Sequence, residues 1–249
     1  MPPKVSVSGL SIAFGQTRAL DRVSLTVGDG EFVSIVGPSG CGKSTMLNVI
    51  AGLLAPAEGG TSVAGIETNG AGSRSGYMFQ KDTLLPWATA LDNICLPMDV
   101  KGERDAHKAR ALIQMVDLTG FEAHYPRQLS GGMRKRVQLA RLLAQDPEVL
   151  LMDEPFGALD AQTREVMQEE LLRIWQQDKK TVVFVTHSIS ESIFLADRIA
   201  VMATRPGSIK EIVDVTLPHP RDRSSLEFVA LERQIKRLVR EEVAKLGVT

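Results

Sequence analysis

The stretch Gly37-Pro38-Ser39-Gly40-Cys41-Gly42-Lys43-Ser44-Thr45 decides how this chain folds. It follows the apolar run 32–36, which reads as a strand, and leads into residues 46–53, which read as a helix. Strand, glycine-rich turn and helix together match the G-x-x-x-x-G-K-[ST] pattern in the context that it requires. Glycines let the backbone turn several N–H groups toward one point, and the helix N-terminus adds unpaired N–H groups and a positive dipole. The sequence therefore predicts a polyphosphate site built from these nine residues.

Lys43 and Ser44 are the two side chains of this loop with a direct chemical role. Lys43 is placed to reach the terminal phosphates, and Ser44 can hold Mg²⁺ through its hydroxyl, because magnesium prefers hard oxygen ligands. Cys41 is expected to be a small packed residue, with a reactive thiol as the alternative. A plain glycine turn with a solvated lysine competes with this interpretation, but the fixed positions and both flanks agree with the phosphate site.

The composition describes a globular chain. Its 249 residues can form one large domain or two small ones, and 43% of them are apolar. The formal net charge of −1 gives no reason to expect nucleic acid as the main partner. Two cysteines without a C-x-x-C pair fit a reducing cytosol and exclude a disulfide framework. The sequence has no signal-peptide core and no apolar run near the ~18 residues of a span, so we expect another chain to provide any membrane anchor.

Two apolar runs predict the centre of a sheet. Residues 149–152 and 181–185 are apolar throughout, as in strands that are covered on both faces. Residues 160–178 between them are expected to form a crossover helix, which makes the two strands parallel neighbours.

Strands and helices alternate along the rest of the chain. Further strands are expected at 4–14, 18–27, 32–36, 76–79, 199–203 and 209–215, and helices at 103–118 and 224–246. Ser224 and Glu227 offer a capping box for the last helix. The segment 59–76 is rich in glycine and is expected to be loose up to the short strand at its end.

Asp153 and Glu154 end the buried run 149–152, at the sheet edge where open α/β proteins bind ligands. Asp153 is expected to complete the magnesium shell opposite Ser44. Glu154 points differently because side chains alternate along a strand, and it can polarise a water for attack on a γ-phosphate. Two acids that cap the next helix are the alternative, and the glycine loop upstream favours the catalytic interpretation.

A second anion site is predicted at Leu129-Ser130-Gly131-Gly132-Met133, where a serine and two glycines precede the helix begun by residues 134–141. Taken alone, this is an ordinary helix cap. One chain seldom needs two phosphate sites for one nucleotide, so the second site can face a nucleotide on another copy of the chain. A homodimer with two composite sites would follow.

Two polar residues come directly after predicted strands. The amide of Gln80 can contact the metal or the attacking water. The imidazole of His187 can hydrogen-bond the γ-phosphate or orient Glu154. The alternatives are a satisfied loop residue for Gln80 and a helix cap for His187.

In order and spacing, these motifs resemble those of the ATP-binding cassette (ABC) transporter ATPases over about residues 4–215. The family's motifs are carried here by 37–45 (Walker A), Gln80 (Q-loop), 129–133 (signature), 150–154 (Walker B), 158–160 (D-loop) and His187 (H-loop). The resemblance implies an α/β fold, with a P-loop NTPase core, an antiparallel β subdomain and a helical subdomain. It places the core with the β subdomain at 1–80 and 146–220, the helical subdomain that carries the signature at 81–145, and a C-terminal amphipathic helix at 221–249.

The resemblance also implies ATP and Mg²⁺ as cofactors and a role for each matching residue. Catalysis would fall to Glu154, His187, Lys43 and Gln80, and metal binding to Ser44, Gln80 and Asp153. Nucleotide contacts would come from Phe14, Gly37, Pro38, Ser39, Gly40, Cys41, Gly42, Lys43, Ser44, Thr45, Ser130, Gly131, Gly132 and Asp160. Phe14 would stack on adenine, where the family more often has tyrosine, and Asp160 would lie across the dimer interface. Met133 stands where glutamine is commoner, which leaves the serine hydroxyl and both glycine amides of the signature intact.

Four further segments resemble the ATPases of importers for nitrate, taurine and other sulfonates. They are Leu84-Leu85-Pro86-Trp87, Leu91-Asp92-Asn93-Ile94, Phe156-Gly157-Ala158-Leu159-Asp160 and Arg205-Pro206-Gly207-Ser208-Ile209. This implies an ATPase that powers uptake of a small anionic solute through separate integral membrane permease subunits. It would sit peripherally at the cytoplasmic face of the cell membrane, with a solute-binding protein as an indirect partner. We expect residues 82–91 to form a groove wall for a permease helix; alternatively, Trp87 packs into the helical subdomain.

Other classes of protein share the phosphate loop. A soluble ABC-type ATPase acting on ribosomes or DNA usually carries two cassettes or a long coiled-coil insertion, and this sequence shows neither. A small-molecule kinase would lack the 129–133 motif and the pair of Gln80 and His187. A regulatory ATP sensor is disfavoured by the intact Glu154.

Overall fold

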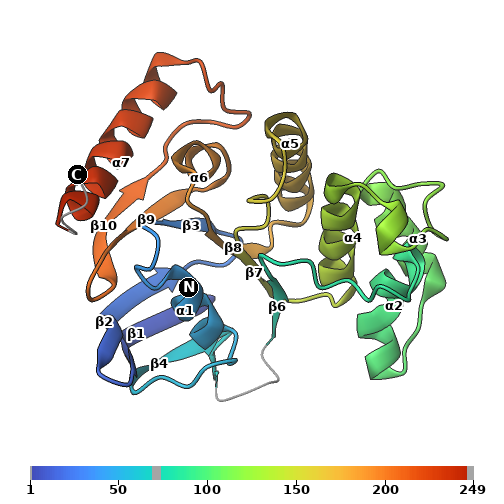
Figure 1. Cartoon of the computed structure of the whole chain (residues 1–249), viewed down its shortest axis with the longest axis horizontal. Coiled ribbons are helices and arrows are strands. Elements are labelled where there is room, and N and C mark those ends of the chain that lie inside the picture. Colours follow the sequence, from blue (N-terminus) through green and yellow to red (C-terminus); the bar gives the residue numbers. More distant parts are fainter. Residues whose placement is uncertain (1, 69–73, 246–249) are drawn as a thin grey trace.

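The structure is a computed structural model that describes residues 2–68 and 74–245. Two sheets form its framework (Figure 1), with the strand orders β10-β9-β3-β8-β7-β6 and β2-β1-β4-β5. The larger sheet contains β3 (Phe32–Val36), β6 (Ser75–Met78), β7 (Val149–Asp153), β8 (Thr181–Val185), β9 (Arg198–Ala203) and β10 (Ser208–Asp214). The smaller sheet contains β1 (Val5–Phe14), β2 (Thr17–Val27), β4 (Glu58–Val63) and β5 (Ile66–Glu67).

The predicted parallel centre of the larger sheet is confirmed. β7 pairs in parallel with β8, Leu150 lying opposite Val182, and α5 (Ala161–Asp178) provides the crossover between them. β3 continues the parallel pairing on the other side of β8. Every residue of these three strands is buried, because the sheet is covered on both faces. Their carboxyl ends share one edge, so the segments that follow them are brought close together.

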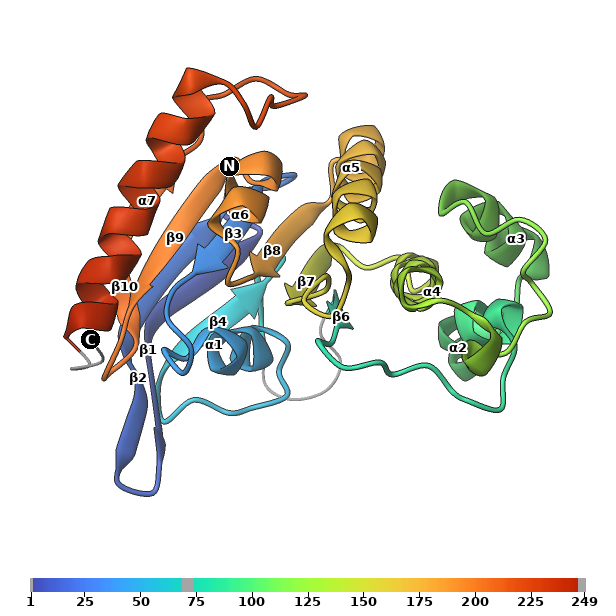
Figure 2. The ribbon, with the colours of Figure 1, turned by 45° about the horizontal axis from the view of Figure 1, so that its top comes forward.

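The alternation of side chains along these strands divides the core in two. Val33 and Ile35 of β3 pack with α1 (Lys43–Ile50) and the smaller sheet, whereas Phe32 packs on the opposite face with α5 and α6 (Ile189–Leu195). Helix α1 therefore lies between the two sheets, as Figures 1 and 2 show. This sandwich fixes the start of α1, where the predicted phosphate site lies, from both sides.

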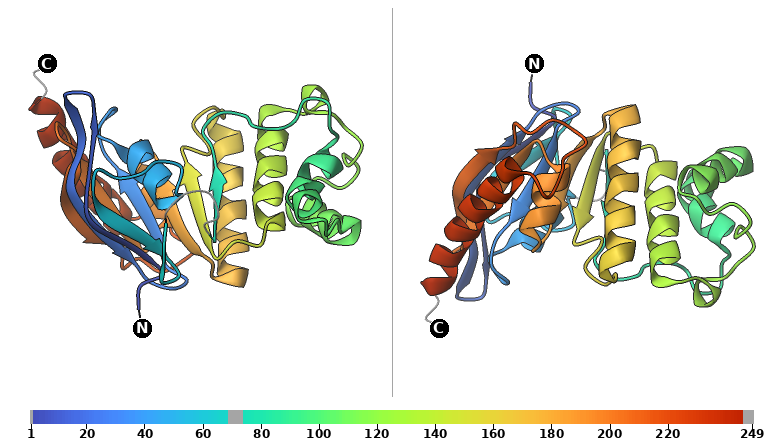
Figure 3. Two further views of the ribbon diagram at one scale, coloured as in Figure 1. Left: turned by 90° about the horizontal axis from the view of Figure 1, so that it is seen from below. Right: turned by 90° about the horizontal axis from the view of Figure 1, so that it is seen from above.

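Three helices form a separate group beyond α5 (Figure 3). They are α2 (Ala90–Lys101), α3 (Ala106–Met115) and α4 (Gly131–Ala144), with a 3₁₀ turn at Pro126–Gln128. The helix predicted at 103–118 is α3, and it begins later because the Asp105 carboxylate caps it by accepting from the N–H groups of His107 and Lys108, both at 2.9 Å.

The expectation of a loose segment at 59–76 is wrong for its first part. Residues 58–63 form β4, which pairs antiparallel with β1 so that Val63 lies opposite Val5. Glycine disfavours strands locally, but the pairing with β1 and the burial of Val63 override that preference. Gly70 and Gly72 lie outside the described residues.

Helix α7 (Leu226–Ala244) ends the described chain and packs against the larger sheet near β9 and β10 (Figure 1). The predicted capping box at Ser224 is wrong, because Ser225 caps the helix by accepting from Phe228 N at 3.2 Å. Ser224 instead donates to Asp222 Oδ1 through its hydroxyl and its N–H. The apolar face of α7 joins the core through Phe228, Ile235 and Leu238.

None of the helices within residues 2–68 and 74–245 combines the length and the apolarity that a bilayer crossing requires.

Candidate nucleotide site

The phosphate loop is tightly packed where it begins α1. Gly42 is the N-cap of α1 with a φ of 97°, a conformation that favours glycine, and a Cβ atom there would overlap Leu20 Cδ2. Cys41 is fully buried, and this burial raises the pKa of its thiol. The structure thus supports Cys41 as a packing residue rather than a reactive thiol.

Lys43 folds back onto its own loop. Its Nζ donates to the carbonyl oxygens of Gly37 at 2.9 Å and Pro38 at 3.0 Å, and the residue is only 7% exposed. An ammonium group has three donors, and the third contact of Nζ, with Cys41 Sγ at 3.8 Å, is a weak one that an anion could replace. The positive charge is therefore held inside the loop that the sequence assigns to phosphate.

Ser44 and Asp153 meet although 109 positions separate them: Ser44 Oγ donates to Asp153 Oδ1 at 3.0 Å. Asp153 ends β7, next to the sheet edge where α1 begins. Burial raises the pKa of Asp153, although the Ser44 hydrogen bond opposes the shift. Tyr77 on β6 is a neighbour that the sequence analysis missed, and its own pKa is raised by burial and then by the charge of Asp153.

These two oxygens fit a magnesium ion that is shared with a ligand. Mg²⁺ commonly takes one or two protein oxygens and fills its octahedron with phosphate oxygens and water. Among the described residues, no group of three or more His, Cys, Asp or Glu side chains could hold a metal alone. Ser44 and Asp153 therefore suit an ion that arrives with a nucleotide, because a cation would also compensate the buried carboxylate of Asp153.

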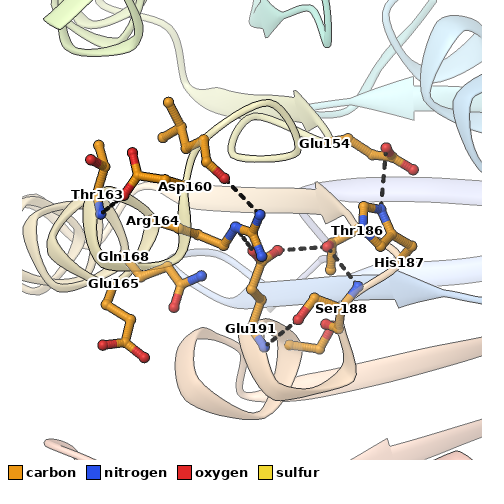
Figure 4. A network of polar contacts seen from close by, with 12 residues as sticks. Glu154, Asp160, Thr163, Arg164, Glu165, Gln168, Thr186, His187, Ser188 and Glu191 are labelled. Carbon is orange, nitrogen blue, oxygen red and sulfur yellow. Dashed lines mark hydrogen bonds and ion pairs between the residues drawn. The ribbon is translucent and has the colours of Figure 1, made fainter. Parts of the chain in front are cut away.

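Glu154 contacts Gln80 and His187, the two polar residues that follow strands β6 and β8. Its Oε2 accepts from Gln80 Nε2 at 2.9 Å. The same oxygen lies 3.3 Å from His187 Nδ1, as Figure 4 shows for these two side chains. The alternative in which the two acids cap the next helix is wrong, because Asp160 caps α5. One carboxylate oxygen in contact with an amide and an imidazole is suited to hold and polarise a water.

The backbone fixes the direction of the Glu154 side chain. Glu154 has a φ of 44°, which is unusual for a residue with a Cβ, and its N–H donates to Val185 O at 2.8 Å. This hydrogen bond extends the pairing of β7 with β8 by one residue. Glu154 thereby turns out of the strand toward His187, which follows β8, while Asp153 stays directed at the phosphate loop.

Gln80 is also tied to α4, a connection that the sequence analysis missed. Lys135 Nζ donates to Gln80 O at 2.9 Å, and Gln138 Nε2 donates to Asp82 Oδ1 at 2.8 Å. Lys135 is 5% exposed, and its burial lowers its pKa. Helix α4 begins at Ser130, Gly131 and Gly132, here called the serine-glycine turn. The contacts of α4 therefore connect this turn to Gln80, which touches Glu154.

The serine-glycine turn lies apart from the phosphate loop of the same chain. Ser130 caps α4 by accepting from Met133 N at 3.2 Å, and α4 lies on the far side of α5 and β7 from α1 (Figures 1 and 3). A Cβ atom on Gly132 would lie 2.5 Å from Thr163 Cγ2, so this turn packs against the start of α5. The turn therefore packs against the start of α5, next to Asp160, and lies away from the phosphate loop of its own chain.

Phe14, the residue expected to stack on adenine, ends β1 and is 55% exposed. An exposed ring at a strand end is available to a flat partner.

The structure holds Lys43, Ser44, Asp153, Glu154, Gln80 and His187 at one edge of the larger sheet.

Gly207 supports the phosphate loop from outside, a role that the sequence analysis did not assign. Its N–H donates to Ala19 O at 3.0 Å, and its carbonyl accepts from Asp21 N at 2.9 Å. A Cβ atom on Gly207 would overlap the carbonyl oxygen of Cys41. The turn between β9 and β10 is therefore wedged between β2 and the phosphate loop.

We expect Gly207→Ala to weaken ATP binding about tenfold. Overpacking at such a site costs about 1–3 kcal/mol, and about 1.4 kcal/mol corresponds to a tenfold change in affinity. Equilibrium titration with a fluorescent ATP analogue measures the effect. Gly60→Ala is the matched control, because no described atom lies within 4 Å of its Cβ position. Equal affinities for the two variants would contradict the proposed support.

Known proteins resemble this chain in sequence and in structure. The family model described as ABC transporter matches residues 20–157. An uncharacterized ABC transporter ATP-binding protein of Methanocaldococcus jannaschii is 49% identical over 98% of this chain and 94% of that protein. The aliphatic sulfonates import ATP-binding protein of Bacillus licheniformis is 46% identical over 90% of this chain and 89% of that protein.

A solved structure shares the fold. A dimeric ATP-binding cassette in a post-hydrolysis state, bound to ADP and inorganic phosphate, superposes with a TM-score of 0.75 at 36% identity. The match covers 86% of this chain and 100% of that one. The expected fold class, an ABC ATPase cassette with a parallel core sheet and an antiparallel sheet, is confirmed. With the family model covering more than half of its length, this chain belongs to the ABC transporter family as one of its ATP-binding, ATP-hydrolysing proteins.

Proposed function

We propose that this chain is the ATPase subunit of an importer for a small anionic solute of the nitrate, taurine or sulfonate kind. In this proposal it works as a homodimer bound to integral permease subunits at the cytoplasmic face of the cell membrane. The observation that carries the catalytic part is the contact of Glu154 Oε2 with both Gln80 and His187, beside the pair formed by Ser44 and Asp153. The similarity to an aliphatic sulfonates import ATP-binding protein supports the class of solute.

In the proposed reaction, one group of residues binds ATP and Mg²⁺, and a second group activates the attacking water. Residues 37–45 bind the phosphates through their N–H groups, and Lys43 turns from the loop carbonyls toward the γ-phosphate. Ser44, Asp153 and Gln80 would hold Mg²⁺, which neutralises charge that develops on the phosphate oxygens. Glu154 accepts a proton from the attacking water, and His187 holds Glu154 and the γ-phosphate in place.

The serine-glycine turn and Asp160 would complete the site of a second copy. Ser130, Gly131 and Gly132 provide a hydroxyl and two N–H groups at the start of α4, a helix that α5 and β7 separate from α1 (Figure 1). Two ATP molecules between two chains would then hold the dimer closed, because each chain alone leaves the triphosphate partly unsatisfied. Hydrolysis removes this preference for the closed state and lets the dimer open.

The proposed permease contact rests on an exposed tryptophan and on a cavity that is lined in part by the segment 82–91. Trp87 is 74% exposed, so the alternative in which it packs into the helical subdomain is wrong. A cavity of about 350 Å³ opens between β6 and helices α2 and α4. Thr83, Leu96, Val100 and Arg141 are among the residues that line it. An exposed tryptophan and a mostly apolar hollow that the same segment, 82–91, lines through Thr83 suit a docked helix of a partner protein.

Trp87→Ala is expected to reduce recovery of the permease by a factor of about 30 or more in a pull-down from detergent-solubilised membranes. Truncation of a central tryptophan anchor typically costs about 2 kcal/mol or more. Leu226→Ala is the control, because Leu226 is 84% exposed on α7, outside the proposed groove. Full recovery of the permease by Trp87→Ala would contradict the proposed contact.

Uptake of labelled solute tests the proposed function as a whole. Cells that express this chain together with its cognate permease subunits are given labelled taurine, an alkanesulfonate or nitrate. We expect ATP-dependent uptake of at least one of these anions and none with Glu154→Gln. ATP hydrolysis without uptake of any of the three would favour a soluble ABC-type ATPase or a different cargo.

A further inference from the structure

A buried carboxylate holds the turn that carries His187. Glu191 on α6 is 5% exposed, and its Oε2 accepts from Thr186 Oγ1 at 2.6 Å (Figure 4). Thr186 directly precedes His187, and the same Oγ1 accepts from Ser188 N at 3.0 Å. One hydroxyl therefore clamps the chain on both sides of His187, and Glu191 orients that hydroxyl.

The same carboxylate faces an arginine that holds the loop of Asp160. Arg164 Nη2 donates to the carbonyl of Leu159 at 2.7 Å, directly before Asp160. Its Nε lies 3.7 Å from Glu191 Oε1. The Asp160 carboxylate in turn accepts from Thr163 N at 2.9 Å. Glu191 thus stands between the two loops, with one oxygen directed to each (Figure 4).

The contact between Arg164 and Glu191 is close but not a hydrogen bond. Arg164 Nε is buried without a hydrogen-bond partner, and 3.7 Å exceeds hydrogen-bond length. Burial raises the pKa of Glu191, which reflects how poorly its charge is solvated there. The energy of a buried charge depends strongly on the distance to its partner. A small displacement of Leu159 moves Arg164, and this changes how strongly Arg164 holds Glu191 in place.

We propose that Arg164 and Glu191 are positioning residues that transmit the placement of the Asp160 loop to His187. The proposal rests on the proposed composite site, in which Asp160 faces the second chain. A partner that docks on this loop fixes Leu159 and with it Arg164. Glu191 then holds Thr186, and the clamped turn sets His187 Nδ1 against Glu154 Oε2, now 3.3 Å away. Closure of the dimer thereby aligns the residue that activates water.

Glu191→Gln tests the charged link. It keeps the size of the side chain and an oxygen for Thr186, but removes the charge that faces Arg164. We expect kcat for ATP hydrolysis to fall about tenfold or more, because small misplacements at a reacting centre are costly. KM for ATP should stay within about twofold, because the phosphate loop is untouched.

Glu170→Gln is the matched control. Glu170 is 7% exposed, Arg136 Nε lies 3.4 Å from its Oε2, and Arg136 also donates to a backbone carbonyl, that of Val116. This pair has the same composition but joins α4 to α5 away from His187 and Asp160. We expect its kcat to equal that of the unaltered protein, with thermal melting reporting the folding of both variants.

The threonine provides a second test that does not depend on Glu191. Thr186→Val removes the hydroxyl and should lower kcat as Glu191→Gln does, whereas Thr186→Ser keeps the hydroxyl and should restore it. Thr186→Val combined with Arg164→Lys should be no slower than the slower single variant, because both interrupt one link.

Two results would overturn the proposal: unchanged kcat in Glu191→Gln and Thr186→Val, or additive losses in the double variant. A failure of the composite site would show separately, as a rate for the unaltered protein that rises only linearly with its concentration.

Discussion

Glu154→Gln will bind ATP as tightly as the unaltered protein and will barely hydrolyse it. Glutamine keeps the shape of the side chain but cannot accept a proton from water. Loss of a general base typically slows a reaction by about 10²–10⁴-fold. The phosphate loop, Lys43 and the pair of Ser44 and Asp153 are unaffected, because Glu154 contacts Gln80 and His187 instead.

Single-turnover kinetics and equilibrium ATP binding measure this separation of kcat from affinity. We also expect Glu154→Gln to accumulate as a dimer on a sizing column when ATP and Mg²⁺ are present, since the closed state is no longer emptied by hydrolysis. Asp178→Asn on the exposed end of α5 is the control for a change of acid to amide. Normal turnover by Glu154→Gln would refute the assignment of the base.

Lys43→Ala will lose both turnover and ATP affinity. The buried ammonium is the positive charge at the centre of the phosphate loop, and its Nζ also holds the carbonyls of Gly37 and Pro38. Removal of one preorganised charge stabiliser costs about 3 kcal/mol at the transition state, which corresponds to roughly a 100-fold loss in rate. We expect the affinity to fall as well, because in the proposed site the lysine would also contact the phosphates of bound ATP.

The two variants therefore separate two roles with one pair of assays. Glu154→Gln should change kcat alone, whereas Lys43→Ala should change kcat and the Kd for ATP together. Lys236→Ala on the surface of α7 controls for the loss of a lysine, since Lys236 pairs only with Glu232 at 3.0 Å among the described residues. A Lys43→Ala variant that retains half of the normal rate would contradict the proposed role of the loop.

The sequence predicts well what local geometry determines. The phosphate loop, the buried run before Asp153 and the serine that caps α4 are set by residue types at short spacing. The apolar runs of β7 and β8 likewise predict a parallel pair, because only a sheet covered on both faces buries them completely.

What the sequence could not predict depends on contacts between distant segments. β4 forms in a glycine-rich segment because β1 is available to pair with it. The hydrogen bond from Lys135 to Gln80 joins residues 55 positions apart, and no local sequence pattern predicts it. The exposure of Trp87 depends equally on how the helices beyond α5 pack.

The choice of the residue that caps a helix is also hard to predict from sequence. Ser224 and Ser225 are adjacent and chemically alike, so spacing alone cannot choose between them as a cap. The Asp222 carboxylate determines which serine caps the helix, because it accepts hydrogen bonds from both the N–H and the hydroxyl of Ser224. The Ser225 hydroxyl then caps α7. Gly207 is similar: the Cβ position that makes glycine necessary is visible only once β2 and the phosphate loop are in place.

In the proposed homodimer, the serine-glycine turn of one chain closes over the triphosphate bound by another. A crystal structure of Glu154→Gln with ATP and Mg²⁺ would show this arrangement or exclude it. We predict a dimer in which the Ser130 hydroxyl and the Gly132 N–H lie at hydrogen-bond distance, ~3 Å, from the γ-phosphate held by the partner's phosphate loop. Bound ATP with that turn remote from every phosphate would contradict the proposed composite site.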